Sequence, residues 1–350
     1  MSSAPVTIRP AAGDDRSGWD AFALSARGGS LLSTWAWGEL RRRGGWEAHR
    51  LLAERADGSV AGTMWVQVRR GRTGVGFAYA PRGPLVADTH ADTEAALNLI
   101  EAGTEVARRR RALLLKLDPE WRTDDPAAAA IVHAARLRPS WYDVQHRKTY
   151  LVDLTGGPDA VLARVKESTR RAIRQCERAG VEVEVATDPD DALRFYPLLR
   201  ESGRRNGFIP RESGYYRDLV ETVSASCPVA VLLAHLDGEL VAGMIGVACG
   251  SRLIYLYGGN RLGGRVHPAY AVQWAAIRWG TGLGCAVYDM WGVPNHEDPT
   301  RPGFGYYEFK TRFNGTVVRH IRCQEARLWP LGLLPRLAER LALRGRPLLT

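Results

Sequence analysis

A short segment of this chain occurs twice, about 180 residues apart. Residues 57–66 read Asp-Gly-Ser-Val-Ala-Gly-Thr-Met-Trp-Val, and residues 237–247 read Asp-Gly-Glu-Leu-Val-Ala-Gly-Met-Ile-Gly-Val. Each copy begins with an Asp-Gly pair, which favours a tight hairpin turn, and continues into small and apolar residues that suit a strand. A second strand-like run follows each copy, at 75–80 and at 253–257. The repetition predicts a duplicated domain, with a functional site at the junction of the two copies.

The order of the expected elements repeats as well. In the first half we expect helices within 19–43, strands at 46–54, 60–69 and 75–80, a helix over 91–110, a strand at 112–117, a helix over 123–136 and a return to strand within 139–153, near 150–153. In the second half we expect a helix over 158–179, a strand at 181–186, helices over 189–204 and 213–225, strands at 228–236, 240–249 and 252–258, a helix over 268–282 and a strand at 286–290. This order predicts two α/β domains with mixed sheets, over residues 1–148 and 149–322, with the tail 323–350 packed on the first.

Composition narrows the class of protein. A chain of 350 residues is long enough for two domains, and its net charge of +10 favours an anionic partner such as nucleic acid, a phosphate-bearing substrate or a membrane surface. The five cysteines are irregularly spaced and include no Cys-x-x-Cys pair, which supports neither a disulfide framework nor a zinc site. No apolar run is long enough to span a membrane, and the N-terminus lacks an apolar signal core. We therefore expect a cytoplasmic protein without a bound metal.

The expected helix over 158–179 carries cations at every fourth position: Lys166, Arg170, Arg174 and Arg178. Like charges four residues apart destabilise a helix by about 0.2–0.5 kcal/mol per pair. An anionic partner such as RNA would offset that cost. The alternative is a solvated face on which Glu167 and Glu177 relieve the repulsion.

Three further segments contain residues suited to binding or catalysis. Arginines and tyrosines cluster in 204–216, where Arg211 and Tyr215 could contact phosphate, although a plain surface loop explains the same pattern. The glycine-rich stretch 255–265 precedes a helix and could hold an anion on its backbone N–H groups. Lys310 is one of only four lysines and stands among aromatic residues in 303–315. It is either a cation–π partner or a preorganised cation for a developing oxyanion.

The hairpin followed by a glycine loop and a helix resembles the GNAT acyltransferase fold, and its duplicated form resembles the FemABX-like peptidyltransferases. The likeness runs over nearly the whole chain, in segments 32–41, 79–84, 256–259, 288–292 and 305–315 and in the basic helix with Gly180-Val181. Ser33 and Arg41 stand where that family usually has glutamine and lysine, and Arg41 keeps the positive charge. The second half contains no long heptad stretch, so we expect no coiled-coil arm, as in the shorter members of the family.

The resemblance implies roles for particular residues. Lys310 matches the lysine that the family associates with catalysis and with the tRNA end. The precursor would be bound by Arg41, Trp37, Tyr79, Arg211, Tyr215, Tyr255 and Tyr257. The tRNA would lie against the basic helix with Lys166, Arg170, Arg174 and Arg178. Asp88 and Asp289 are the candidates for a general base, unless the substrate's own groups accept the proton.

The implied activity is transfer of an amino acid from aminoacyl-tRNA to an amine of a peptidoglycan precursor stem peptide, forming an interpeptide bridge. The precursor would be either lipid II or a UDP-linked muropeptide. A tRNA ester is already activated, so we expect no cofactor. A monomer is expected, and the Arg/Leu-rich tail could rest on the inner membrane face.

Three alternatives remain open. The same aminoacyl-tRNA ligation could act on a small-molecule or peptide secondary metabolite. The chain could instead be a non-catalytic RNA-binding protein built on the basic helix. An acetyl-CoA acetyltransferase is less favoured, because 261–266 only partly matches the pyrophosphate-binding loop of such enzymes.

Overall fold

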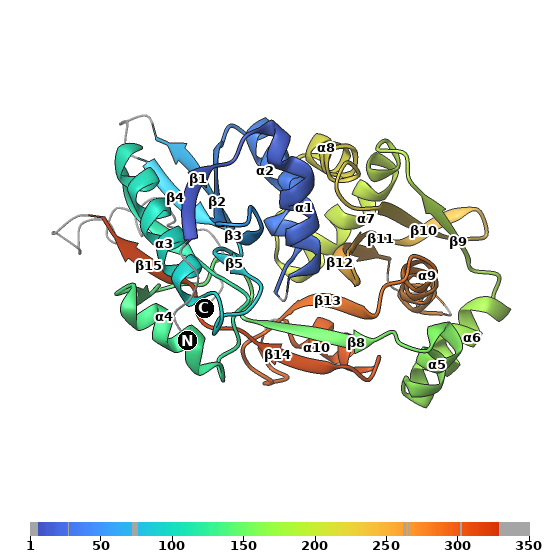
Figure 1. The fold of residues 1–350 in the computed structure, drawn as a ribbon. Coiled ribbons are helices and arrows are strands. Elements are labelled where there is room, and N and C mark those ends of the chain that lie inside the picture. Colours follow the sequence, from blue (N-terminus) through green and yellow to red (C-terminus); the bar gives the residue numbers. More distant parts are fainter. Residues whose placement is uncertain are drawn as a thin grey trace. The chain divides into compact units, whose positions relative to one another are not determined.

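The fold is described from a computed structural model, which defines residues 6–26, 28–71, 76–261, 264, 266–301 and 303–328. The chain divides into two compact units, one of Met1–Arg147 with Arg319–Thr350 and one of Lys148–Val318. Each unit contains one sheet covered by helices, as Figure 1 shows. The expected α/β class with mixed sheets is confirmed.

The first unit is built on a sheet with the strand order β1-β2-β3-β4-β6-β15-β7, and β5 pairs with β3 beside this path. The strands are β1 (Val6–Pro10), β2 (Glu47–Arg55), β3 (Val60–Arg70), β4 (Gly76–Ala80), β5 (Leu85–Val86), β6 (Ala112–Leu117), β7 (Arg138–Pro139) and β15 (Gln324–Arg327). The helices are α1 (Arg16–Ser25), α2 (Trp35–Arg43), α3 (Thr93–Arg109) and α4 (Pro126–Ala134), with short 3₁₀ turns at Gly13–Asp15 and Leu31–Ser33.

The second unit has a sheet with the strand order β14-β8-β13-β12-β11-β10-β9. The strands are β8 (Lys148–Asp153), β9 (Glu182–Ala186), β10 (Val229–Leu236), β11 (Glu239–Cys249), β12 (Arg252–Asn260), β13 (Val287–Val293) and β14 (Thr316–Arg319). The helices are α5 (Gly157–Arg164), α6 (Glu167–Arg178), α7 (Asp191–Asn206), α8 (Ser213–Val223), α9 (Ala269–Gly282) and α10 (Phe304–Thr311).

The two sheets share one connectivity. In the first unit β1, β2, β3 and β4 pair antiparallel in sequence, and β4 then pairs parallel with β6 after the crossover helix α3. In the second unit β9, β10, β11 and β12 pair antiparallel, and β12 pairs parallel with β13 after α9. Two helices separate the first two of these strands in each unit, α1 and α2 in one and α7 and α8 in the other. The repeated hairpin therefore belongs to a repeated topology.

The two Asp-Gly turns differ in detail. Asp237 and Gly238 both have positive φ, +52° and +79°, which is the two-residue turn that matches strand twist. In the first copy Gly58 has a positive φ and the Asp57 carboxylate accepts the N–H of Ser59. Residues 56–59 separate β2 from β3 there, so this connection is longer than the two-residue turn of the second copy. The Asp-Gly pair thus correctly predicts a turn in both copies. It predicts the tight two-residue turn correctly only in the second copy.

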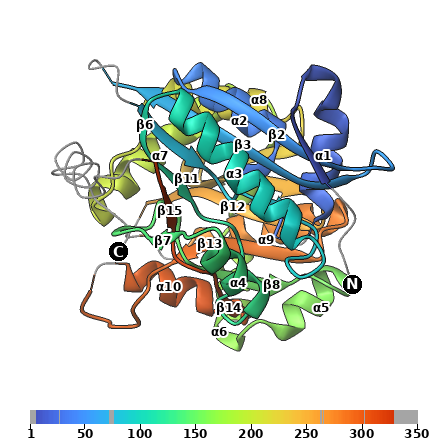
Figure 2. The same cartoon turned by 60° about the vertical axis from the view of Figure 1, so that its left-hand side comes forward.

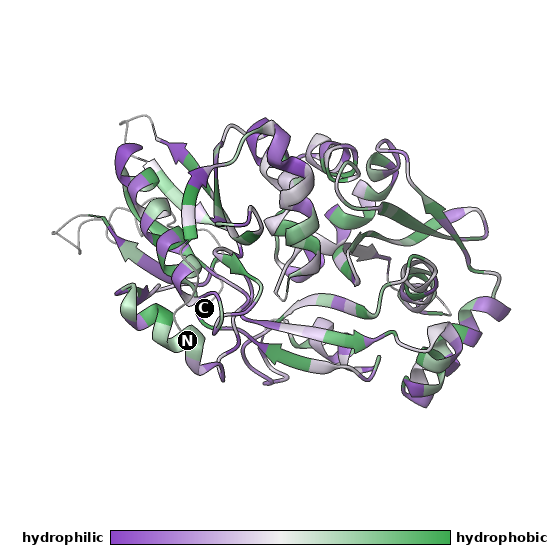
Figure 3. Cartoon of the chain, viewed as in Figure 1, coloured by the Kyte–Doolittle hydropathy of each residue, from purple (hydrophilic) through white to green (hydrophobic). Residues whose placement is uncertain are grey.

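Helices pack on both faces of the second sheet. An added Cβ at Gly243 in β11 would lie 2.9 Å from the Phe195 ring of α7, whereas the next residue, Met244, contacts Gln273 of α9. Successive side chains point to opposite faces of a strand, so α7 and α9 cover opposite faces. In the first unit α3 packs along β2, β3 and β6, as Figure 2 shows. The strands β10 and β11 are strongly hydrophobic, whereas α6 is largely hydrophilic (Figure 3).

Several expected elements need correction. The expected single helix over 158–179 is wrong, because Val165 and Lys166 are extended and separate α5 from α6. The Arg312 carbonyl accepts from the Lys166 N–H and from the Thr169 hydroxyl at this break, a long-range contact that no local pattern reveals. The helix expected over 123–136 is shorter, since Asp125 caps α4 at its start. Helix α10 and strands β1, β5, β7, β14 and β15 were not expected.

Part of the expected tail and loop lies outside the described residues. Within the tail, β15 pairs antiparallel with β6 of the first unit, while residues 329–350 are not described. Within the glycine-rich stretch, residues 262, 263 and 265 are not described.

Candidate functional site

Lys310 lies in the last turn of α10. At the other end of this helix, Gly303 is the N-cap residue and has φ +95°. Its side chain is buried and only 7% exposed. The ammonium donates a 2.7 Å hydrogen bond to the Gly292 carbonyl and lies 5.3 Å and 5.8 Å from the ring centres of Tyr306 and Tyr255. Burial lowers the pKa of Lys310 to about 7, and the Asp289 carboxylate opposes part of that fall. Lys310 can therefore exchange a proton near neutral pH.

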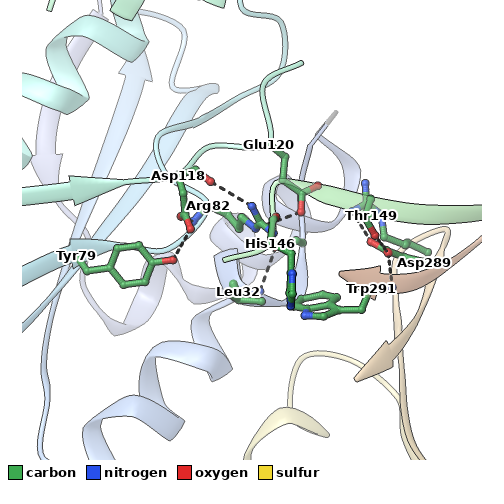
Figure 4. Close-up of polar contacts among 11 residues, drawn as sticks. Leu32, Tyr79, Arg82, Asp118, Glu120, His146, Thr149, Asp289 and Trp291 are labelled. Atoms are coloured by element: carbon green, nitrogen blue, oxygen red, sulfur yellow. Dashed lines mark hydrogen bonds and ion pairs between the residues drawn. The ribbon is translucent and has the colours of Figure 1, made fainter. Parts of the chain in front are cut away.

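The carbonyl that holds Lys310 is set by an irregularity in β13. The pairing of β13 with β8 shifts register between Asp289 and Gly292, and Trp291 in this bulge has φ +65°. One Asp289 oxygen accepts from the Trp291 N–H at 2.8 Å and from the Thr149 hydroxyl, as Figure 4 shows. The other lies 3.4 Å from the Arg252 guanidinium. The Asp289 carboxylate is thus buried, and both of its oxygens have partners. These contacts stabilise the bulge that presents the Gly292 carbonyl to Lys310.

Tyr255 and Tyr257 have different neighbours. The β11–β12 pairing shifts register between Ile245 and Gly246, so that Ile245 faces Tyr257 and Gly246 faces Tyr255, with Leu256 as the extra residue. Tyr255 lies beside Lys310, and Gly258 leaves room for its hydroxyl, which would be 1.8 Å from an added Cβ. Burial raises the pKa of Tyr255 to about 12, so it stays protonated at neutral pH.

Tyr257 belongs to a cluster that contains two other predicted residues. Its ring packs edge-on at 5.0 Å against Tyr216 of α8, which packs in the same way against Tyr215 at 5.4 Å. The Arg211 guanidinium lies 4.7 Å from the Tyr215 ring centre, and the Arg211 N–H donates to the Tyr216 hydroxyl. The structure therefore brings Arg211, Tyr215 and Tyr257 together, with Arg211 exposed at the surface of the cluster.

Tyr79 of the first unit is buried, and its hydroxyl already makes a hydrogen bond within the protein. It donates a 2.6 Å hydrogen bond to Asp118, whose other oxygen accepts from the Arg82 N–H (Figure 4). The Arg82 guanidinium also lies 3.4 Å from Glu120. Burial raises the pKa of Asp118 to about 6, against the opposing effects of Arg82 and Tyr79. A precursor contact by Tyr79 stays a prediction.

Trp37 and Arg41 share one face of α2, four residues apart. Thr34 caps this helix by accepting from the Trp37 N–H, and the Trp37 side chain is buried. Arg41 is half-buried, donates from Nε to the Gln67 side chain at 2.9 Å and lies 4.9 Å from the Trp46 ring centre. These contacts hold the guanidinium in one place, and phosphate binding by Arg41 stays a prediction.

Asp88 is exposed and forms the turn before α3, where one carboxylate oxygen accepts from the N–H groups of His90 and Ala91. It lines a cleft in the first unit with the acidic residues Glu120, Asp124 and Asp125. Thr89 donates to Asp125, and Arg122 pairs with Asp124. The two candidate bases therefore differ, because Asp88 is open to solvent and Asp289 is buried.

The four cations predicted to bind tRNA differ in how exposed their side chains are. Lys166, Arg174 and Arg178 are exposed. Arg170 is half-buried and donates to the carbonyls of Leu162, Ala163 and Val165, at 3.4, 3.0 and 2.5 Å. It therefore caps the C-terminus of α5, and its availability to RNA is lower than that of the other three.

Sequence reasoning missed the groups that set the environment of Lys310. Tyr306 and the Gly292 carbonyl lie within segments recognised as family-like, but their contacts depend on α10 and on the β13 bulge, neither of which was expected. Among the described residues, no group of three or more His, Cys, Asp or Glu is placed to hold a metal ion. The helices described here include none with the length and hydropathy of a membrane span.

Comparison with protein families gives two matches in sequence order. Residues 15–133 match the FemAB family, and residues 163–311 match the acetyltransferase (GNAT) domain. These ranges fall in the first and second units respectively. The resemblance expected from the sequence is confirmed.

Two relatives are about one quarter identical to this chain. The UDP-N-acetylmuramoylpentapeptide-lysine N(6)-alanyltransferase of Weissella viridescens is 24% identical over 293 residues, covering 79% of this chain and 83% of the relative. The lipid II:glycine glycyltransferase of Staphylococcus aureus is 25% identical over 227 residues, covering 62% of this chain. This chain spans about half, 53%, of the glycyltransferase's length.

Solved structures show the same fold. The crystal structure of FemX matches with a TM-score of 0.82 and 20% identity, covering 95% of this chain and all of that one. A tandem GNAT protein from the clavulanic acid biosynthesis pathway matches with a TM-score of 0.57 and 14% identity, covering 93% of this chain and 99% of that one. The expected pair of GNAT-like domains is therefore confirmed.

Proposed function

We propose that this chain, a FemABX-like protein, is an aminoacyltransferase that adds an amino acid from aminoacyl-tRNA to an amine of a peptidoglycan precursor stem peptide. The observation that carries the proposal is the similarity to the alanyltransferase over 79% of the chain, together with that to the glycyltransferase. Both relatives are named for adding an amino acid to a peptidoglycan precursor. The structure supplies a buried lysine with a lowered pKa that suits the chemistry.

The reaction joins an amine to an activated ester. The amine nitrogen forms a bond to the ester carbonyl carbon, and the bond from that carbon to the tRNA 3′-oxygen breaks. The amine must lose a proton and the 3′-oxygen must gain one. With a pKa of about 7, neutral Lys310 accepts the proton, and the resulting ammonium stabilises the oxyanion before protonating the leaving oxygen.

Other residues have supporting roles in this proposal. Tyr255 and Tyr306 border the Lys310 ammonium and limit its access to water, which keeps its pKa low. Asp289 acts as a positioning residue rather than as the base, because its carboxylate is occupied by Thr149, Trp291 and Arg252. Arg211 is exposed beside Tyr215 and binds a precursor phosphate, and Arg41 on α2 binds another. Trp37, Tyr215 and Tyr257 are further proposed precursor contacts, and the Tyr215 ring centre lies 4.7 Å from the Arg211 guanidinium.

The tRNA is proposed to bind the exposed cations of α6. Lys166, Arg174 and Arg178 are solvent-exposed, and the helix is strongly polar outside its buried residues Thr169, Ile173 and Cys176. Such a face offers phosphate contacts without an apolar surface that would need covering.

The test is whether loss of the amino acid from tRNA depends on the acceptor. Purified protein is incubated with charged tRNA, with and without the precursor, and the remaining aminoacyl-tRNA is measured over time. We expect deacylation to need both the precursor and the protein, and to disappear in Lys310→Met. Deacylation that proceeds equally without the precursor, or in Lys310→Met, would contradict the proposal.

A further inference from the structure

The loop between α7 and α8 exposes two large apolar side chains. Ile209 is 89% exposed and Phe208 is 40% exposed, whereas the other exposed large hydrophobic residues in the described part of the chain lie between 38% and 47%. Single exposed apolar side chains are common on protein surfaces. Ile209 differs because almost its whole side chain is in water and its neighbour is also exposed.

This loop has a defined conformation. The Phe208 N–H donates to the Gly203 carbonyl at 3.1 Å, and the Arg211 N–H donates to the Tyr216 hydroxyl at 3.1 Å. Gly207 ends α7 with φ +74°, and an added Cβ at Gly203 would lie 2.7 Å from the Phe208 carbonyl oxygen. The chain on both sides is thus fixed, so the loop presents Ile209 outward instead of packing it.

Cations flank the two apolar side chains in the sequence. Residues 200–212 contain four arginines and two glutamates, a net charge of +2. Arg200, Arg204 and Arg211 are exposed, and Arg205 is bonded to Asn260. An exposed apolar tip, Phe208 and Ile209, in a cationic segment matches the boundary between the anionic headgroups and the acyl chains of a bilayer. The exposed face of α6 lacks such a tip and suits RNA instead.

We propose that the loop 207–212 enters the surface of an anionic bilayer and that the acceptor is therefore lipid-linked. The inference rests on the proposed function, because it takes Arg211 as a phosphate contact. In a lipid-linked precursor the phosphates join the sugar to the lipid and lie at headgroup level. When Arg211 binds these phosphates, the residues beside it lie at the bilayer surface. Ile209, two residues away, then lies at the boundary between the headgroups and the acyl chains. A nucleotide-linked precursor would present a polar nucleoside there, for which isoleucine offers no hydrogen bond.

Vesicle binding tests the surface without any turnover. The full chain is sedimented with phosphatidylcholine vesicles, with and without phosphatidylglycerol. The double variant Phe208→Ser/Ile209→Ser is compared with Val185→Ser/Leu193→Ser, which removes two apolar side chains that are 43% and 38% exposed elsewhere on the same unit. We expect binding only to the anionic vesicles, a loss of about tenfold in the loop variant and no change in the control.

The opposite outcomes overturn the proposal. A wild-type protein that does not bind anionic vesicles, or a loop variant that binds as well as the wild type, contradicts a bilayer contact. Loss of self-association in the loop variant, with unchanged vesicle binding, would show that a second copy of the chain covers the loop instead.

Turnover then separates this inference from the proposed function. Transfer is measured on the lipid-linked precursor in anionic vesicles and on the same precursor with a short, water-soluble lipid. The loop variant should lose most transfer in vesicles and keep the wild-type rate on the soluble form. Equal loss on both would assign the loop to general precursor binding and overturn the bilayer role. No transfer by the wild type on either would refute the proposed function, while the vesicle result would stand.

Discussion

At the scale of single residues, the proposed activity depends on one lysine whose burial disfavours its charged form. The sequence predicts Lys310 as a cation near the ester. The structure buries it against a carbonyl and two tyrosine rings, so that its pKa falls to about 7. A fixed cation would assist only the oxyanion, whereas this group can also carry the proton.

Substitutions of Lys310 separate charge from proton transfer. Lys310→Arg keeps a cation that cannot lose its proton at neutral pH, and Lys310→Met removes both functions. We expect both to lower kcat by about 100-fold or more while circular dichroism stays unchanged. An arginine variant with near wild-type turnover would contradict proton transfer by Lys310.

The pH dependence has a definite sign. Neutral Lys310 is the active form of the free enzyme, so kcat/KM should rise with pH and level off above an apparent pKa of about 7. The Asp289 carboxylate raises the pKa of Lys310, so Asp289→Asn should move this limb to lower pH. Asparagine can still accept from the Trp291 N–H, which keeps the bulge.

Asp153→Asn is the control for this shift, since Asp153 is an exposed carboxylate of the neighbouring strand β8. It should leave the pH profile unchanged. If the apparent pKa does not move in Asp289→Asn, or moves equally in the control, the Asp289 carboxylate does not raise the pKa of Lys310.

At the scale of elements, α6 is the cationic helix proposed to bind tRNA. Arg174→Glu with Arg178→Glu should weaken binding of charged tRNA by about tenfold or more at low salt and reduce the salt dependence of the binding constant. Arg278→Glu, an exposed arginine on α9, is the control. Filter binding over a salt series measures both effects. If the control weakens binding as much as the α6 variant, net charge and not this helix accounts for the affinity.

Elements set by local chemistry could be predicted from the sequence, and those set by distant contacts could not. The hairpin at Asp237-Gly238 and the span of α9 follow from turn residues and periodicity. The break at Val165 depends on the Arg312 carbonyl, nearly 150 residues away in the chain. Likewise, β15 is a strand because it completes the sheet of the first unit beside β6. The family motif identified Lys310, but its lowered pKa follows from packing.

At the scale of the whole molecule, both units contain the same run of five paired strands, and the C-terminal segment returns to the first unit. Lys116 of β6 is fully buried and donates to Glu325 of β15 at 2.8 Å and to Ser140. Its ammonium also lies 4.1 Å from the Tyr142 ring centre. This buried pair joins residues more than 200 positions apart in the sequence.

Removal of one partner should destabilise the first unit. Glu325→Gln leaves a buried ammonium without its counter-charge, and we expect a loss of about 3–5 kcal/mol in the free energy of unfolding. Glu167→Gln breaks the exposed pair with Arg171 and should cost less than about 1 kcal/mol. Urea unfolding of the full chain measures both. Equal losses would show that the Lys116–Glu325 pair does not hold β15 in place.

Mass spectrometry of the precursor tests the central claim most directly. The protein is incubated with the precursor and a pool of charged tRNA, and the stem peptide is fragmented to locate any added mass. The account predicts one or more amino-acid residues in amide linkage on the side-chain amine of the stem, formed by the wild type and not by Lys310→Arg. A stem peptide of unchanged mass after incubation with every charged tRNA would contradict it.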